Sequence, residues 1–153
     1  MPISLKNEAA IAGIGCTDFS KQSGVSELTL AAQCIKAACD DAGVSPSQID
    51  GLVSYTLDSN DEIEIARAVG AGDRTLFRKI TYGGGAAVGT IAQAAMAVAT
   101  GQASTVVCYR AMNGRSGKRM GQGVSGELLT SDAIHWSWYM TYGMLIPGSW
   151  VAM

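Results

Sequence analysis

The stretch ITYGGGAAVGT, from Ile80 to Thr90, decides the fold that we expect for this chain. Residues typical of a β-strand end in three consecutive glycines, Gly83, Gly84 and Gly85, and an alanine-rich segment typical of a helix follows them. The turn from a strand into a helix is where α/β proteins hold ligands, because the carboxyl ends of the strands and the helix N-termini meet there. Glycines at such a turn let backbone N–H groups approach a carbonyl or an oxyanion closely. They equally let the helix pack tightly against the strand, and the sequence leaves both roles open.

On both sides of this turn, strand-like and helix-like segments alternate. Apolar runs predict strands over residues 9–17, 49–58, 75–82 and 104–112. Helical spacing predicts helices over residues 26–42, 59–70 and 86–102, with Ser26 as the cap and Gly43 as the stop of the first, and Ser59 or Asn60 as the cap of the second. The last helix is apolar on every side, so we expect it to be buried on every side. The alternation predicts an α/β fold with a mixed, mostly parallel sheet and a buried central helix.

Composition argues against several classes of function. The 153 residues are 48% hydrophobic, enough for one domain with a core, and the net charge of −2 gives no electrostatic footprint for nucleic acid or an anionic membrane. No apolar run reaches the roughly 18 residues of a membrane span, and the start lacks the pattern of a secretory signal. The four cysteines form no C-x-x-C pair and there is one histidine, so we expect no metal site and small buried thiols in a reducing compartment. We therefore expect a cytoplasmic protein without nucleic-acid or membrane partners.

After Asn113 the sequence changes character, and we divide the chain into residues 1–112 and 113–153. A glycine-rich basic stretch comes first, and an aromatic segment with all three tryptophans follows it. The run GQGVSG, Gly121 to Gly126, has the spacing of a dinucleotide-binding fingerprint. It neither follows a strand nor opens a helix, so we expect a loop instead. Four basic side chains of this region either meet phosphates or remain solvated: Arg110, Arg115, Lys118 and Arg119.

Four stretches, in the correct order, resemble the N-terminal half of a thiolase-superfamily protein of the lipid-transfer-protein or sterol-carrier-protein-x branch. They are AAIAGIGCTDFSK, AAQCIKAACDDAGVSPSQIDGL, YGGGAAVGTIAQAAMAVATGQASTVVCYRAMN and TYGMLIP, and they cover most of the chain. The resemblance implies that residues 1–112 are the N-terminal α/β half of a thiolase fold. It implies that residues 113–153 begin an inserted loop domain, which is truncated.

The chain departs from true thiolases of this branch at the glycine-rich turn, where those proteins carry the nucleophilic cysteine. The corresponding position here is Gly84, and no Cys, Ser or Thr occurs from Tyr82 through Val88. Thiolysis and acyl transfer need a nucleophile to form an acyl-enzyme, whereas retro-aldol cleavage needs a base and donors that stabilise a thioester enolate. The resemblance to Cys-less members therefore implies an aldolase, a C–C lyase that cleaves a bulky, steroid-like β-hydroxyacyl-CoA. Two alternatives stay open: an acyltransferase with an unrecognised nucleophile, and a non-catalytic thiolase half that binds acyl-CoA or a partner.

Several residues are candidates for the site. Tyr82 borders the turn and is a candidate base if its pKa is lowered, although a packing role is the alternative. His135, the lone histidine, is a weaker candidate, and the resemblance places the main acid/base residues in a second half. The glycines of the turn would bind substrate, and an aromatic cluster would either line an acyl tail or pack the loop domain: Trp138, Tyr142 and Met144.

The resemblance also implies the partners. Coenzyme A enters as the thioester substrate and no bound cofactor is expected. A homodimer is expected, and a small partner with a zinc ribbon and an OB-fold is possible. Asp18 and Asp58 follow predicted strands, and we expect them to be caps or surface residues.

Overall fold

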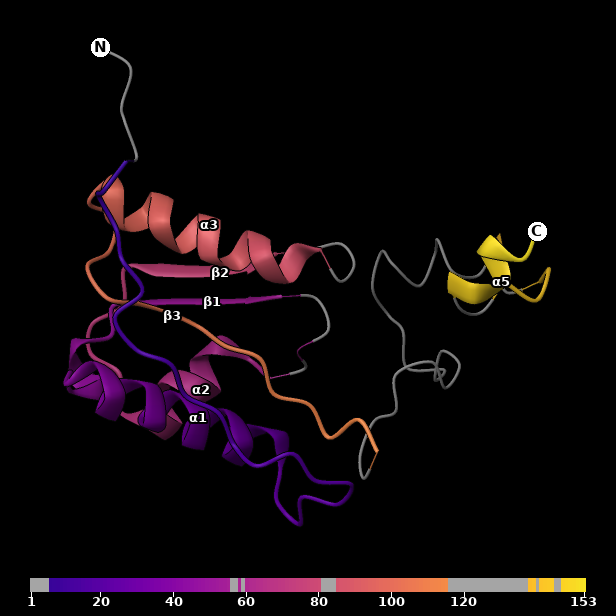
Figure 1. Ribbon diagram of the computed structural model, residues 1–153, viewed down its shortest axis with the longest axis horizontal. Coiled ribbons are helices and arrows are strands. Elements are labelled where there is room, and N and C mark those ends of the chain that lie inside the picture. Colours follow the sequence, from indigo (N-terminus) through magenta and orange to yellow (C-terminus); the bar gives the residue numbers. More distant parts are fainter. Residues whose placement is uncertain are drawn as a thin grey trace. The chain divides into compact units, whose positions relative to one another are not determined.

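The computed structural model describes residues 6–55, 58, 60–80, 85–115, 138–139, 141–144 and 147–153 (Figure 1). The chain divides into two compact units, Met1–Asn113 and Gly114–Met153. The sequence placed a boundary after residue 112, beside this division, and the assignment of the second unit to a loop domain stays a prediction.

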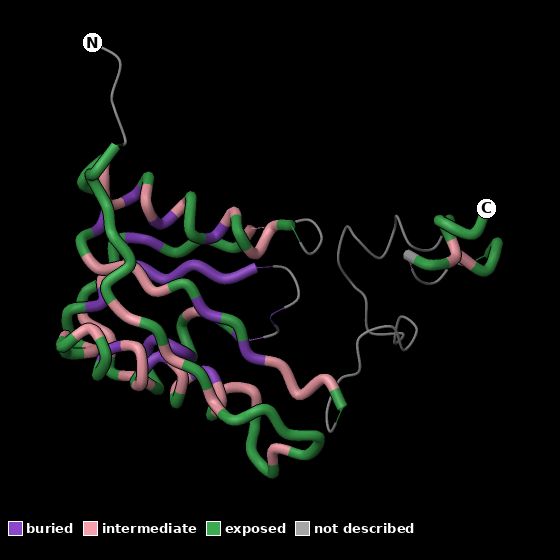
Figure 2. The backbone as a smooth tube through the Cα atoms, viewed as in Figure 1, coloured by how far each residue is buried: buried purple, intermediate pink, exposed green. Residues whose placement is uncertain are grey.

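The first unit contains a three-stranded sheet. Its strands are β1 (Gly51–Tyr55), β2 (Leu76–Ile80) and β3 (Val106–Cys108), in the order β2-β1-β3. All are parallel, with Val53 of β1 opposite Arg78 on one side and Cys108 on the other. β1 is buried along its whole length because it lies between its neighbours and is covered on both faces (Figure 2). The α/β class is confirmed, and the sheet of the described residues is wholly parallel.

Helices cover both faces of the sheet (Figure 1). Helices α1 (Glu27–Ala42) and α2 (Glu62–Val69) lie on one face, and α3 (Ala86–Ala99) lies on the other. Apolar side chains of α1 and α2 form one core cluster with Leu52, and those of α3 form a second cluster with Val53. Successive residues of β1 thus point to opposite faces, as the period of a strand requires. A short 3-10 helix, η1 (Pro46–Gln48), precedes β1, and α5 (Pro147–Val151) belongs to the second unit.

Local capping signals set the ends of the helices on the first face. Ser26 caps α1, its side chain accepting the Thr29 N–H at 3.1 Å, and Gly43 ends that helix in the left-handed conformation with φ of 68°. Both predictions for α1 are confirmed. For α2 the predicted cap is wrong: Asp61 occupies the cap position, and Asn60 is buried in the preceding loop.

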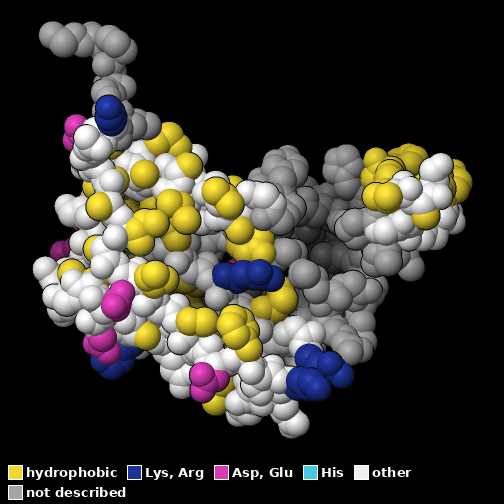
Figure 3. Space-filling model, in the orientation of Figure 1, with side chains coloured by type: hydrophobic (Ala, Val, Ile, Leu, Met, Phe, Trp, Pro, Cys, Tyr) yellow, Lys and Arg dark blue, Asp and Glu magenta, His cyan; other side chains and the backbone are white. Residues whose placement is uncertain are grey.

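The prediction that the central helix is buried on every side is wrong for the described residues. α3 buries Thr90, Ala94 and Ala97, while Val88 is 72% exposed and Ile91 and Met96 are also exposed. Hydrophobic side chains accordingly gather on the visible face of the first unit (Figure 3). Only one face of the helix packs against the described sheet, so its apolar composition exceeds what that contact requires.

The predicted strand over residues 9–17 is also wrong. The segment forms no described strand, and Ile11 and Ile14 are largely exposed. It packs closely on α1 instead: a Cβ at Gly13 or Gly15 would overlap the α1 backbone, and the Ile14 N–H donates to an Asp41 carboxylate oxygen at 2.9 Å. A strand needs a neighbour to accept its backbone hydrogen bonds, and none of the described strands pairs with this segment.

Two further features concern the whole described chain. No helix among the described residues is long and apolar enough to cross a membrane. Within those same ranges, no three side chains of His, Cys, Asp or Glu are grouped so as to hold a metal ion.

Candidate functional site at the carboxyl edge of the sheet

The carboxyl ends of the three parallel strands meet at one edge of the sheet. The turn after β2 leads from this edge into α3, as the sequence predicts, and Gly85 occupies the cap position of that helix. Gly85 supplies no side chain to cap the first N–H groups of α3, and no side chain of the described residues caps them. The start of a helix is a place where proteins bind anionic groups. Tyr82, Gly83 and Gly84 lie outside the described residues.

Gly85 meets neither of the usual structural requirements for glycine. Its backbone has φ of −65° and ψ of −23°, which any residue adopts. A Cβ built at Gly85 meets no described atom within 4 Å, so packing against the sheet does not demand a glycine there. Of the two roles that the sequence left open, the geometry at Gly85 favours room for a ligand.

Asp58 is a buried carboxylate three residues beyond the end of β1. It is 2% exposed, and its Oδ1 accepts the backbone and side-chain N–H groups of Asn60, each at 2.9 Å. Its Oδ2 accepts the Ala111 N–H at 2.7 Å, which ties the loop after β1 to the chain after β3. Asp58 is therefore neither a surface residue nor the cap of the helix that follows, so the prediction of a cap or surface residue is wrong. The pattern Asp-x-Asn directly after a buried strand was the available signal, because such side chains bond to nearby backbone groups.

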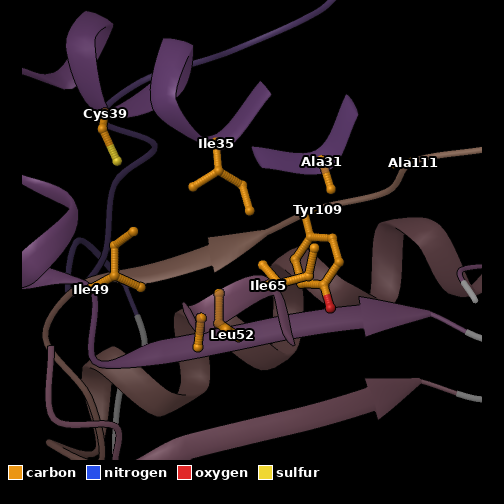
Figure 4. Close-up of a cluster of buried hydrophobic side chains, with 9 residues drawn as sticks. Ala31, Ile35, Cys39, Ile49, Leu52, Ile65, Tyr109 and Ala111 are labelled. Carbon is orange, nitrogen blue, oxygen red and sulfur yellow. The ribbon is translucent and has the colours of Figure 1, made fainter. Parts of the chain in front are cut away.

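Tyr109 lies directly after β3 and was not singled out from the sequence. Its ring packs between the helices and β1, with the hydroxyl turned toward β1 (Figure 4). The hydroxyl is buried and has no hydrogen-bond partner among the described residues. The nearby Ser54 hydroxyl donates to Glu62 Oε1 at 2.9 Å. Burial first, and then the charges of Glu62 and Asp58, raise the pKa of Tyr109 well above its usual value, so this phenol keeps its proton.

We expect the raised pKa of Tyr109 to make the protein less stable at high pH. The folded state holds this proton more tightly than the unfolded state, so stability is full below about pH 10 and falls above it, by up to about 1.4 kcal/mol per pH unit. Tyr109→Phe should reduce this slope and leave the free energy of unfolding near pH 7 unchanged or higher, because it removes an unsatisfied buried hydroxyl. Chemical denaturation between pH 7 and 11 measures both. Tyr142→Phe, an exposed control, should keep the wild-type slope; equal slopes for Tyr109→Phe and wild type would contradict the assignment.

The described cysteines offer no activated nucleophile at this edge. Cys39 is buried, Cys34 is half-buried, and Cys16 and Cys108 are exposed, so the prediction of uniformly buried thiols is wrong. The Cys108 sulfur faces α3, 3.5 Å from the Thr90 carbonyl oxygen. Although Cys108 is exposed as a residue, its sulfur is partly desolvated where it lies against α3, and this desolvation raises the pKa of the thiol. At neutral pH Cys108 is therefore a protonated thiol, the weakly nucleophilic form.

The aromatic candidates belong to the second unit. Trp138 and Tyr142 are 72% and 78% exposed, and Met144 is half-buried. Tyr139 and Trp150 make an edge-to-face contact with ring centroids 4.4 Å apart. His135 lies outside the described residues. A role for these residues in substrate binding stays a prediction.

The first unit is an α/β unit in which α3 begins beside the carboxyl ends of parallel strands, a common place for a ligand. No family model matches the chain. It is similar to the steroid side-chain-cleaving aldolase of Thermomonospora curvata, with 52% identity over 151 residues, 97% of this chain and 39% of that protein. It is equally similar to the 17-hydroxy-3-oxo-4-pregnene-20-carboxyl-CoA lyase of Mycobacterium tuberculosis, with 52% identity over 151 residues and the same coverage.

A solved structure agrees with these relatives. The Ltp2-ChsH2(DUF35) aldolase superimposes with a TM-score of 0.79 at 51% identity, over 94% of this chain and 36% of that chain. The chain thus spans 39% of the length of the curated relatives that it matches. These relatives are an aldolase and a steroid CoA lyase, the class of enzyme that the resemblance to Cys-less thiolase-like proteins implied.

Proposed function

We propose that the protein is a C–C lyase that cleaves the side chain of a steroid-like β-hydroxyacyl-CoA by a retro-aldol reaction. The observation that carries this proposal is the 52% identity to two steroid-cleaving relatives over 151 residues, a span that includes the glycine-rich turn. The open space at Gly85 supports it, because a bulky acyl group needs room beside Gly84, the position that corresponds to the thiolase cysteine.

The proposed reaction needs no acyl-enzyme. A base removes the proton of the β-hydroxyl, the bond between the α and β carbons breaks, and a ketone leaves. The electron pair remains as a thioester enolate, whose oxygen is stabilised by N–H groups at the uncapped start of α3. Protonation of the α carbon then releases the shortened acyl-CoA. We propose Tyr82 as the candidate base and His135 as a weaker one. We place the main acid/base groups in a second half of the protein, which would correspond to the part of the relatives that this chain does not span.

The partners are proposals of the same kind. The substrate brings coenzyme A as its thioester, and no resident cofactor is required. The solved aldolase joins two named components, Ltp2 and ChsH2(DUF35), which supports a protein partner here, and we propose a small one with a zinc ribbon and an OB-fold. We further propose that the protein forms a homodimer and lies in the cytoplasm. We also propose that residues 1–112 are the N-terminal α/β half of a thiolase fold.

The test is to incubate the full-length protein, with and without such a partner, with a steroid β-hydroxyacyl-CoA. We expect equal amounts of ketone and shortened acyl-CoA, and Cys108→Ala should retain this activity because the thiol forms no intermediate. Intact-mass measurement during turnover should show unmodified protein. A mass gain equal to an acyl group, lost with Cys108→Ala, would point to acyl transfer instead. Tight binding of acyl-CoA without cleavage would favour the non-catalytic alternative.

A further inference from the structure

We propose that Arg110 binds a phosphate group of the acyl-CoA substrate at the carboxyl edge of the sheet. This inference rests on the proposed function, since it assigns part of the same substrate. Arg110 is the first basic residue after β3, and its side chain is exposed.

The backbone of Arg110 is fixed on both sides. The preceding residue, Tyr109, is buried in the core and donates its N–H to the Val53 carbonyl at 3.1 Å. The following residue, Ala111, is buried and donates its N–H to Asp58 at 2.7 Å. The Arg110 Cα is thus held between two anchored residues, which lowers the entropy lost when its side chain binds a ligand.

The side chain is also oriented, while the described residues use few of its N–H donors. The Arg110 guanidinium carbon lies 5.3 Å from the centroid of the Tyr55 ring, and Tyr55, the last residue of β1, is 3% exposed. A cation–π contact of this kind holds the charge over the ring face without using the N–H groups. The other printed contact is a weak one, from Nη2 to the Met112 sulfur at 3.8 Å, and the described residues give Arg110 no ion pair. A planar guanidinium with free donors matches the oxygens of a phosphate.

Arg110 lies on the same face of the sheet as the start of α3. Val106 packs in the α3-side cluster and the Cys108 sulfur meets α3, whereas Val107 and Tyr109 pack on the opposite side. Alternation along the chain therefore places Arg110 on the α3 side. The end of β3 is two strand spacings, about 10 Å, from the end of β2 and its turn. The pantetheine arm of coenzyme A is long enough to bridge a thioester at the turn and a phosphate at Arg110.

The decisive experiment compares a steroid β-hydroxyacyl-CoA with the matching acyl-pantetheine thioester, which carries no phosphate. With the full-length protein, Arg110→Ala should raise KM for the acyl-CoA about tenfold and leave kcat unchanged, because a charge-assisted hydrogen bond to a non-reacting group contributes uniform binding. The same variant should treat acyl-pantetheine as the wild type does. Arg110→Lys keeps the positive charge but loses the paired N–H donors of the guanidinium, so it should show a smaller rise in KM.

A matched control is Arg74→Ala. Arg74 also lies over an aromatic ring, with its guanidinium carbon 5.8 Å from the Phe77 centroid, but it precedes β2 and so lies at the amino edge of the sheet. It should leave KM unchanged for both substrates. An equal loss of kcat on both substrates for Arg110→Ala would place the guanidinium at the reacting atoms and overturn the proposal, as would an unchanged KM for acyl-CoA.

Failure of the proposed function is distinguishable from failure of this inference. If the wild type cleaves neither substrate, the lyase proposal fails. The affinities of wild type and Arg110→Ala for free coenzyme A and for pantetheine, measured by calorimetry, then test the phosphate contact by itself. Weaker binding of coenzyme A by Arg110→Ala, with pantetheine unaffected, would still support the phosphate contact. Equal affinities of Arg110→Ala and wild type for coenzyme A would reject it.

Discussion

Replacing Asp58 by alanine is expected to lower the free energy of unfolding by about 3 kcal/mol or more, because buried donors would lose their acceptor. The carboxylate is buried and accepts two N–H groups of Asn60 and one of Ala111. Alanine cannot accept any of these bonds, and the Ala111 N–H is shielded from water. Equilibrium denaturation with a chemical denaturant, followed by circular dichroism, measures the change.

Two controls separate this effect from the loss of any carboxylate. Asp58→Asn keeps the shape and one acceptor oxygen, so it should cost less than alanine does. Asp40→Ala removes a carboxylate from an exposed pair with Lys36, 3.1 Å apart, and should change stability by less than about 0.5 kcal/mol. If Asp58→Ala and Asp40→Ala proved equally mild, the Asp58 hydrogen bonds would not hold the two loops together.

Local signals in the sequence were sufficient to locate α1, α2, α3 and the three strands of the sheet, whereas α5 was not predicted. Ser26 and Gly43 bracket α1 because capping chemistry depends on residues within one turn of each other. The strand over residues 9–17 was predicted from an apolar run alone, and an apolar run reports burial rather than strand pairing. The packing of Gly13 and Gly15 on α1 depends on a helix that lies far along the chain, which no local pattern reveals.

The candidate site divides in the same way. The glycine-rich turn before α3 was located from the sequence because strand, glycines and helix are contiguous. Tyr109 was missed because Glu62, the charge with the largest effect on it, is distant in sequence. For Asp58 the bonds to Asn60 are local and were overlooked, whereas the bond to Ala111 joins residues far apart along the chain. Arg110 was recognised only as one of several basic residues, and the Tyr55 ring beneath it is what distinguishes it.

Gly85→Ala is expected to separate stability from activity. The backbone at Gly85 suits alanine, and the added methyl group meets no described atom within 4 Å, so the free energy of unfolding should rise by about 0.5–1 kcal/mol. The same methyl group would stand where we place the bulky acyl group, beside the N–H groups that stabilise the enolate. Because a misplacement of about 1 Å can cost about 100-fold, we expect kcat/KM for the steroid β-hydroxyacyl-CoA to fall by about that factor. Thermal unfolding and steady-state kinetics of the same preparation give both values.

Gly89→Ala is the matched control, since it adds the same methyl group one turn further along the same helix. A Cβ at Gly89 would lie 3.7 Å from the Ile80 Cγ2, an ordinary contact, and alanine in a helix interior should stabilise by up to about 1 kcal/mol. This variant should keep the wild-type kcat/KM. A loss of kcat/KM in Gly85→Ala alone would then be an effect on the substrate site and not a general effect of adding a methyl group to α3. Full activity of Gly85→Ala would mean that the acyl group does not occupy the space beside this glycine. A loss of stability instead would show that a part of the protein beyond the described residues packs there, and the glycine would then serve the fold.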